Sequence, residues 1–177
     1  MPQHFALTAV GPDQAGILAA LTEPLVRLRC NLEDSSATIL RGHFMLMMVV
    51  RAPDEVDAPA LVREVQGKCR ELKVDIKIDA RPLPVLGPAP QASHVLSVYG
   101  ADKPGIVHRV AQILGARGVN MLDIKSQVVG RPGRPVYAML LEVLLPEALP
   151  EAELRRDLDE MAQQLSVDVS LRPIEER

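Results

Sequence analysis

Hydrophobic residues in the first half of the chain follow two spacings in turn, one typical of strands and one typical of helices. Ile17, Leu21 and Leu25, for example, fall on one face of a helix. The expected strands are residues 4–10, 31–40, 43–51 and 74–80, and the expected helices are residues 16–29 and the segment from Leu61 to Leu72. The order βαββαβ is typical of a ferredoxin-like fold, in which two helices cover one face of an antiparallel sheet.

The second half of the chain repeats the first. Residues 97–106 match residues 8–17 at an offset of 89, and Asn120 matches Asn31 at the same offset. A repeat of this length indicates one structural unit present twice. The chain is therefore predicted to be an α+β protein with two ferredoxin-like βαββαβ modules in tandem, each an antiparallel sheet with its helices on one face.

The offset changes once along the repeat. Tyr137 matches Phe44 at an offset of 93, so the second copy has gained four residues. We place this insertion in a loop at residues 130–135, because loops accept added residues at little entropic cost.

A proline-rich stretch separates the two modules. Residues 82–92 show neither helical nor strand periodicity and contain repeated prolines, which is typical of a semi-rigid spacer. We expect a first domain at residues 1–81, a linker at 82–92 and a second domain at 93–177.

The third strand of each module does not alternate between apolar and polar residues. Residues 44–50 are continuously apolar, and residues 136–143 are interrupted only by Glu142. A sheet with one solvated face normally alternates, so we expect the far face of each sheet to be covered by the other module or by another chain. Homodimerisation is the expected outcome, and pairing of the two modules is the competing one. A central strand that tolerates apolar residues on both sides is the simpler explanation.

Composition and charge narrow the class of protein. The chain is 47% hydrophobic and 24% charged with a net charge of −3, as in ordinary soluble globular proteins. Scattered basic residues and few aromatic ones argue against direct nucleic-acid binding. No N-terminal signal and no apolar stretch of about 20 residues is present, so we expect a cytoplasmic protein without membrane contact. Cys30 and Cys69 are interpreted as reduced packing residues.

Glycines lie at both ends of the turn that joins the first strand of each module to the first helix. Gly11 and Gly100 end the strand, where glycine most easily adopts a positive φ or allows close backbone approach. Gly16 and Gly105 are expected in the first turn of the helix. The first N–H groups of a helix lack internal partners and carry partial positive charge, so they can receive a carboxylate or phosphate.

Three further residues belong to these turns. Asp13 and Asp102 stand where a helix N-cap is wanted, and Pro104 is tolerated in a first helical turn because its missing N–H would be unused. The alternative to a binding site is plain: each Asp only caps its helix, and the glycines only make the turn tight.

Asn31 and Asn120 begin the second strand of each module. In this topology that end of the strand lies away from the first turn of its own helix, although pairing of modules would bring the Asn of one copy towards the turn of the other. An asparagine amide offers both donor and acceptor, which suits the ammonium and carboxylate of an α-amino acid. An Asn that only favours a tight turn is the alternative.

These residues carry a family resemblance. The turns at residues 11–17 and 100–106, with the segments 31–35 and 120–123, resemble the ACT domain, a small-molecule-sensing module of amino-acid metabolism. More narrowly, the tandem arrangement and the sequence Cys-Asn-Leu-Glu-Asp-Ser at 30–35 resemble the glycine cleavage system transcriptional repressor family. The resemblance implies a regulator that binds an amino acid, typically glycine, and acts through a partner transcription factor.

By position, the resemblance implies a set of ligand-binding residues, with the two asparagines in support: Gly11, Asp13, Gln14, Ala15, Gly16, Ile17, Asn31, Gly100, Asp102, Lys103, Pro104, Gly105, Ile106 and Asn120. Ala15 stands where the family usually has proline, whereas the second turn keeps Pro104. Lys103 also differs in charge from its counterpart Gln14. We therefore expect the second turn to be the better ligand site.

No motif indicates a catalytic residue, a metal ligand or a cofactor. His4, His43, His94 and His108 lie in different elements without metal-ligand spacing. Ser35 lies on an expected strand, without the glycine elbow that exposes a nucleophile. We expect a regulatory protein that binds glycine or serine and contacts a transcription factor or metabolic enzyme. The alternatives are a cryptic hydrolase, the detached regulatory pair of an enzyme such as a formyltetrahydrofolate deformylase, and a ligand-independent pairing module.

Overall fold

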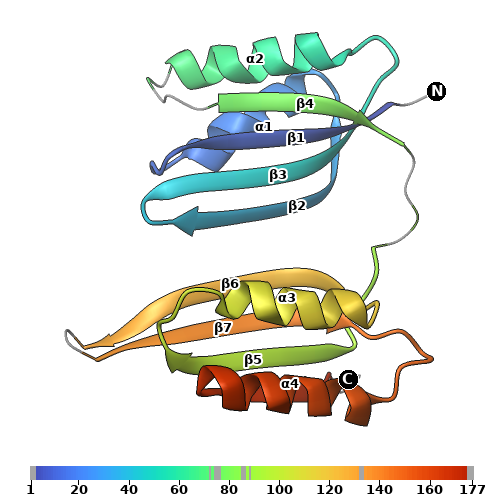
Figure 1. Ribbon diagram of the computed structural model, residues 1–177. Helices are drawn as coiled ribbons and strands as arrows, with labels where there is room; N and C mark the ends of the chain where they lie inside the picture. Colours follow the sequence, from blue (N-terminus) through green and yellow to red (C-terminus); the bar gives the residue numbers. More distant parts are fainter. Residues whose placement is uncertain are drawn as a thin grey trace. The chain divides into compact units, whose positions relative to one another are not determined.

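Two units of the same topology make up the chain (Figure 1). They comprise Met1–Gly87 and Pro88–Arg177, and the boundary falls within the stretch expected to be the linker. The computed structural model describes residues 3–71, 73, 77–84, 87, 89–131 and 134–174. No helix among these residues combines the length and the apolar character that a membrane span requires.

Each unit has the element order βαββαβ, and its four strands form one antiparallel sheet. The first unit consists of β1 (Gln3–Pro12), α1 (Ile17–Arg27), β2 (Asn31–Leu40), β3 (His43–Ala52), α2 (Ala58–Glu71) and β4 (Lys77–Leu83), with strand order β2-β3-β1-β4. The second consists of β5 (His94–Ala101), α3 (Ile106–Ala116), β6 (Asn120–Arg131), β7 (Arg134–Leu144), α4 (Glu151–Leu165) and β8 (Val167–Pro173), with strand order β6-β7-β5-β8. The predicted fold class is confirmed.

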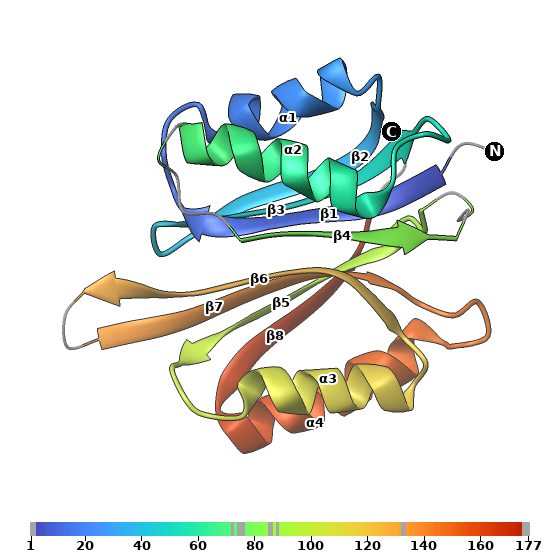
Figure 2. The ribbon, with the colours of Figure 1, turned by 90° about the horizontal axis from the view of Figure 1, so that it is seen from above.

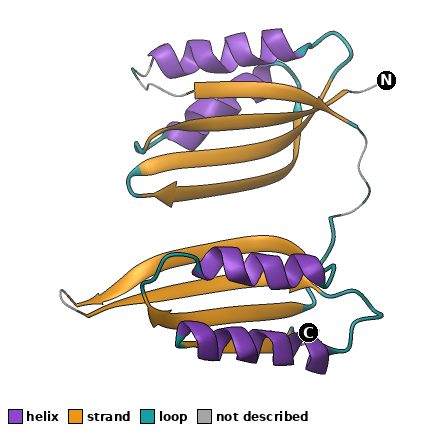
Figure 3. Cartoon of the chain, viewed as in Figure 1, coloured by secondary structure: helices purple, strands orange, loops and turns teal. Residues whose placement is uncertain are grey.

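Both helices of a unit lie on the same face of its sheet (Figures 2 and 3). In the first unit, alternate residues of β1 such as Phe5 and Leu7 are fully buried against Leu21 of α1 and Leu61 of α2. A buried side chain of this size contributes about 1.5–3 kcal/mol. The second unit repeats this core with residues that include Leu96, Val98, Val110, Leu154 and Leu158.

The third strands alternate in burial although their sequences do not alternate in polarity. In β3, Phe44, Leu46 and Met48 are buried beneath the helices, whereas Met47 on the opposite face is 50% exposed. Leu140 of β7 is likewise 42% exposed on the open face of its sheet. The helices therefore account for one apolar face only, and coverage of the other face stays a prediction.

The inserted residues lengthen a hairpin, so their assignment to a loop was wrong. The first hairpin ends with Leu40 paired with His43. At the corresponding position of the second hairpin, the strand ladder continues for two more residue pairs. Gly130 pairs with Pro135 and Arg131 with Arg134. Added residues extend an antiparallel ladder without disturbing its register when equal numbers join each strand. Residues 132–133 lie outside the described residues.

The last strand of the first unit lies later in the chain than expected. It runs from Lys77 to Leu83, whereas residues 74–76 of the predicted strand lie outside the described residues. Pro82 is part of this strand and pairs with Phe5 of β1. A proline is tolerated here because β4 is an edge strand, where one side of the backbone needs no partner.

An ion-pair cluster joins the helices of the second unit. Arg117, which follows α3, donates from Nε to Oδ2 of Asp157 at 2.6 Å and from Nη1 to Oε2 of Glu153 at 3.1 Å, both on α4. The hydrogen bond from Arg117 holds the pKa of the Asp157 carboxyl below its ordinary value of 3.8, against a smaller opposing effect of burial.

This pKa shift predicts an acid-dependent contribution to stability. A carboxyl whose pKa is lower in the folded state stabilises the fold above its unfolded pKa, and that contribution disappears as the pH falls through the folded pKa. Asp157→Asn should therefore lower the melting temperature at neutral pH, and the difference from wild type should vanish well below pH 3.8. Asp159→Asn, an exposed neighbour on α4, is the control. An undiminished difference in acid would contradict the assignment.

Candidate functional site

The two strand-to-helix turns have the same backbone conformation. Gly16 is the N-cap of α1 with φ 86°, and Gly105 is the N-cap of α3 with φ 94°, both in the left-handed region. The first helical hydrogen bonds run from Ala20 N–H to Gly16 O and from Arg109 N–H to Gly105 O, each 3.0 Å. The N–H groups that precede them have no acceptor inside the helix. Each turn therefore presents the partial positive charge of a helix N-terminus.

The predicted capping roles were wrong. Neither Asp13 nor Asp102 caps a helix by its side chain, because the N-cap position is taken by the glycine three residues later. Pro104 and the glycines also precede the helices and do not belong to their first turns. The left-handed glycine turns the chain sharply into the helix, so the aspartates stay outside it. Both carboxylates are exposed and make no hydrogen bond or ion pair with a described residue.

The strand-end glycines have a different role from the N-cap glycines. Neither Gly11 nor Gly100 has a positive φ. Gly100 instead allows close approach of β8, because a Cβ at this position would lie 2.6 Å from Val167 Cγ1 and 3.1 Å from Val167 Cα. The expected close backbone approach is thus confirmed for Gly100.

Backbone and side-chain bonds hold the turns in place, and they differ between the units. In the first turn, Asp13 N–H donates to Gly42 O at 3.0 Å, and Ile17 N–H donates to Gln14 O at 3.2 Å. In the second turn, Lys103 Nζ donates to Leu165 O at 3.0 Å, at the end of α4. A cation is favourable at a helix C-terminus. Lys103 therefore ties the second turn to α4.

Residues 12–16 and 101–105 are exposed, and each turn is followed directly by a buried residue that fixes its position. Ile17 and Ile106, the first residues of the two helices, are 5% and 2% exposed and belong to the hydrophobic cores. The exposed N–H groups of such a turn can donate hydrogen bonds to an anionic group, and the nearby Asp carboxylate can bind a cationic one.

The asparagines lie at the opposite end of the sheet from the turn of their own unit, as expected. Gly11 is opposite Phe44 on β3, whereas Asn31 is opposite Arg51 on the same strand. These β3 positions are separated by roughly 24 Å at about 3.4 Å per residue. The second unit has the same arrangement: Asn120 is opposite Leu144 of β7, whereas Gly100 is opposite Tyr137 of the same strand. Neither unit brings its own Asn to its own turn.

A polar cluster at this end of the first sheet was not predicted from the sequence. Glu33 accepts from Arg51 Nε at 2.8 Å and lies 3.2 Å from His4 Nε2. Glu33 is the extra residue of a β-bulge between Leu32 and Asp34, which redirects its side chain across the strands. The second unit has the bulge at the same place, but Leu122 occupies it, so the cluster distinguishes the two units.

Among the described residues, no group of three or more His, Cys, Asp or Glu side chains is arranged to hold a metal ion. Cys69 is buried and Cys30 half-buried; both are free thiols that pack against the first core, as expected, and burial raises the pKa of each.

Comparison with known proteins identifies the fold family. Residues 3–79 and 94–172 each match the ACT domain. The chain belongs to the ACT domain family. One match falls in each unit, and each match includes a glycine turn. The similarity to the ACT domain, first seen at the turns, therefore extends over most of each unit.

The chain is similar to several other proteins. A UPF0237 protein of Methanosarcina mazei is 32% identical over 76 residues, which cover 42% of this chain and 83% of that protein. The glycine cleavage system transcriptional repressor of Escherichia coli K12 is 29% identical over 130 residues, covering 71% of this chain and 65% of the repressor. The crystal structure of an unknown protein from Galdieria sulphuraria has the same fold, with a TM-score of 0.83 and 22% identity over 99% of this chain and 100% of that one.

The geometry of Gly100 predicts a cost for any side chain at this position. Gly100→Ala should destabilise the second ACT domain by about 1–3 kcal/mol, because the branched Val167 and its backbone cannot both move away. Gly115→Ala, in α3 with no atom within 4 Å of the added Cβ, is the control and should stabilise the helix by up to about 1 kcal/mol. Urea unfolding measures both, and equal effects would contradict the close approach.

The cap assignments predict that replacing two aspartates of the first ACT domain has different effects on its stability. Asp57 accepts from Ala60 N–H at 2.8 Å at the start of α2, so Asp57→Ala should cost about 1 kcal/mol of unfolding free energy. Asp13→Ala should change that free energy by less than about 0.5 kcal/mol, since its carboxylate makes no hydrogen bond or ion pair with a described residue. Chemical denaturation compares the two, and a larger loss for Asp13→Ala would restore its role as a cap.

Proposed function

We propose that this chain is a regulatory protein that binds a small amino acid, glycine or serine, and transmits its binding to a partner protein. The observation that carries the proposal is the family match over both halves, together with the same uncapped glycine turn in each ACT domain. The turn residues named from the sequence are the proposed ligand contacts, and the chain is proposed to have no catalytic role.

The chemistry of an α-amino acid fits the groups that each turn presents. Its carboxylate would accept from N–H groups of the first turn that follows Gly16 or Gly105, which have no acceptor inside the helix and carry partial positive charge. Its ammonium would lie near the carboxylate of Asp13 or Asp102, neither of which is hydrogen-bonded to a residue that the structure describes. A small ligand is favoured because the site is a short exposed backbone segment.

The asparagines extend this proposal to a homodimer. Asn31 and Asn120 lie at the end of the sheet away from their own turns, so they contribute to a ligand site only when another ACT domain supplies the turn, and we propose that a second copy of the chain supplies it. A site shared between two copies couples ligand binding to association, because the ligand then favours the dimer by its differential affinity.

The partner is proposed to be a transcription factor of glycine or one-carbon metabolism. Support comes from the similarity to the Escherichia coli glycine cleavage system transcriptional repressor over 71% of this chain. We propose the second turn as the stronger site, because Lys103 braces it against α4 and adds positive charge beside the helix N-terminus.

A thermal-shift titration tests the proposal. Glycine and serine should raise the melting temperature, because a ligand that binds only the folded state stabilises it by mass action. Asp102→Ala should remove most of this shift and Asp13→Ala less of it. Glu55→Ala removes another exposed carboxylate of the first domain and should leave the shift unchanged.

The contrary result is equally clear. If none of the twenty amino acids raises the melting temperature, the sensor proposal fails and a ligand-independent pairing module takes its place. If Glu55→Ala reduces the shift as much as Asp102→Ala, the effect reflects net charge and the turn is not the site.

A further inference from the structure

An open groove of about 460 Å³ runs between the two helices of the second ACT domain, and none of the glycine turn residues lines it. Its floor is apolar, made by Ile113 and Ala116 of α3 and by the buried Met161 of α4. Polar residues form its rim: Arg109, Gln112, Asp157, Glu160 and Gln164. An apolar floor with a few convergent polar groups is the usual composition of a small-molecule site.

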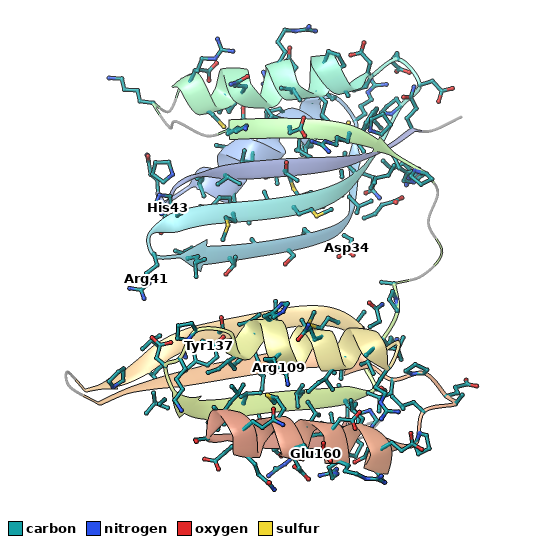
Figure 4. The ribbon with its side chains drawn as sticks, in the orientation of Figure 1. Asp34, Arg41, His43, Arg109, Tyr137 and Glu160 are labelled. Atoms are coloured by element: carbon teal, nitrogen blue, oxygen red, sulfur yellow. The ribbon has the colours of Figure 1, made fainter. Side chains whose placement is uncertain are left out.

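Two charges of opposite sign face this groove without an ionic partner. Arg109 on α3 is held between the amide oxygens of Gln112 at 3.4 Å and Gln164 at 3.3 Å, so its guanidinium is positioned but not neutralised. Glu160 on α4 has no hydrogen bond or ion pair with a described residue. Figure 4 labels both residues on the two neighbouring helices. Asp157, in contrast, is already paired with Arg117.

The first ACT domain has no such unpaired charges at the matching positions. There, Lys68 binds Glu23 at 3.0 Å and Glu71 at 3.4 Å, and Arg27 lies 3.8 Å from Glu64, so ion pairs join α1 to α2. By the repeat, Gln112 and Gln164 replace Glu23 and Glu71, Met161 replaces Lys68 and Ala116 replaces Arg27, whereas Asp157 keeps the acidic group of Glu64. The second domain therefore has apolar residues where the first domain has the cations Lys68 and Arg27 of its interhelical ion pairs.

The same comparison shows what the second domain has gained. Arg109 and Glu160 stand where the first domain has Ala20 and Gly67, neither of which carries a polar side chain. Packed helices lie about 8–10 Å apart, so a guanidinium on one and a carboxylate on the other are separated by a span that a small molecule can bridge. Charges of opposite sign on the two sides of one groove are complementary to a ligand that carries both signs.

We propose that this groove binds a free α-amino acid with an aliphatic side chain. Its carboxylate accepts from the Arg109 guanidinium, for which a two-bond contact is the favoured geometry. Its ammonium pairs with Glu160, and its side chain lies on Ile113, Ala116 and Met161. The inference goes beyond the proposed glycine or serine site, because it concerns different residues and a ligand with an apolar side chain.

An NMR titration of the full chain with leucine tests the groove. Saturable shifts are expected at the backbone amides of Arg109, Ile113 and Gln164. Leucinamide and N-acetyl-leucine each lack one of the two charges and should bind at least about tenfold more weakly, corresponding to the loss of one charged contact. Absence of saturable shifts at these amides would overturn the proposal.

Variants separate the groove from the surrounding surface. Arg109→Ala removes the carboxylate contact, and Ala116→Arg installs the residue that the first domain has at this exposed position and closes the groove. Both should abolish the leucine shifts. Arg156→Ala removes an exposed arginine of α4 that does not line the groove and should leave them unchanged. Equal binding by wild type and Arg109→Ala would overturn the proposal.

The same titration distinguishes this inference from the proposed function. Glycine binding at the turns is followed at the amides of Gly16 and Gly105, which lie outside the groove. Glycine shifts that persist in Arg109→Ala, without any leucine shift at the groove, would retain the sensor proposal and reject the groove. Leucine shifts at the groove without glycine shifts at the turns would do the reverse.

Discussion

Burial of one face of each sheet beneath two helices is the interaction on which the rest of this protein depends. The packing of Phe5, Leu7 and Leu21, and of their counterparts in the second unit, fixes where each helix lies on its sheet. Once Ile17 and Ile106 are buried as the first residues of α1 and α3, the chain has only four residues in which to leave the strand and enter the helix. The sharp turn follows from the packing, and glycine at its last position follows from the turn.

That turn explains why the helix N-terminus is open. A side-chain cap requires the polar residue to occupy the N-cap position itself, where its oxygen can reach the N–H groups of the first turn. A left-handed glycine occupies that position in both domains, so Asp13 and Asp102 remain outside the helix with free carboxylates. Because of this geometry each helix lacks a side-chain cap. Backbone N–H donors and an Asp carboxylate therefore lie together at the surface.

The two copies share a backbone but have different surfaces. A bulge follows the start of the second strand in both sheets, yet it carries Glu33 in one and Leu122 in the other. Ion pairs join α1 to α2, whereas the groove between α3 and α4 carries Arg109 and Glu160, which have no ionic partner among the described residues. Core residues are constrained by packing on all sides, and exposed positions are not, so duplicated domains diverge first at the surface.

The periodicity of apolar residues determined the six elements of each domain, and the repeat determined that there are two, because both depend on local spacing. The uncapped turns and the open groove were decided only by tertiary structure. The φ of Gly16 depends on how α1 packs, and the Arg117–Asp157 and Arg109–Gln164 contacts join residues that are distant in the chain. Such contacts have no period in sequence, since they arise only when packing brings two helices side by side.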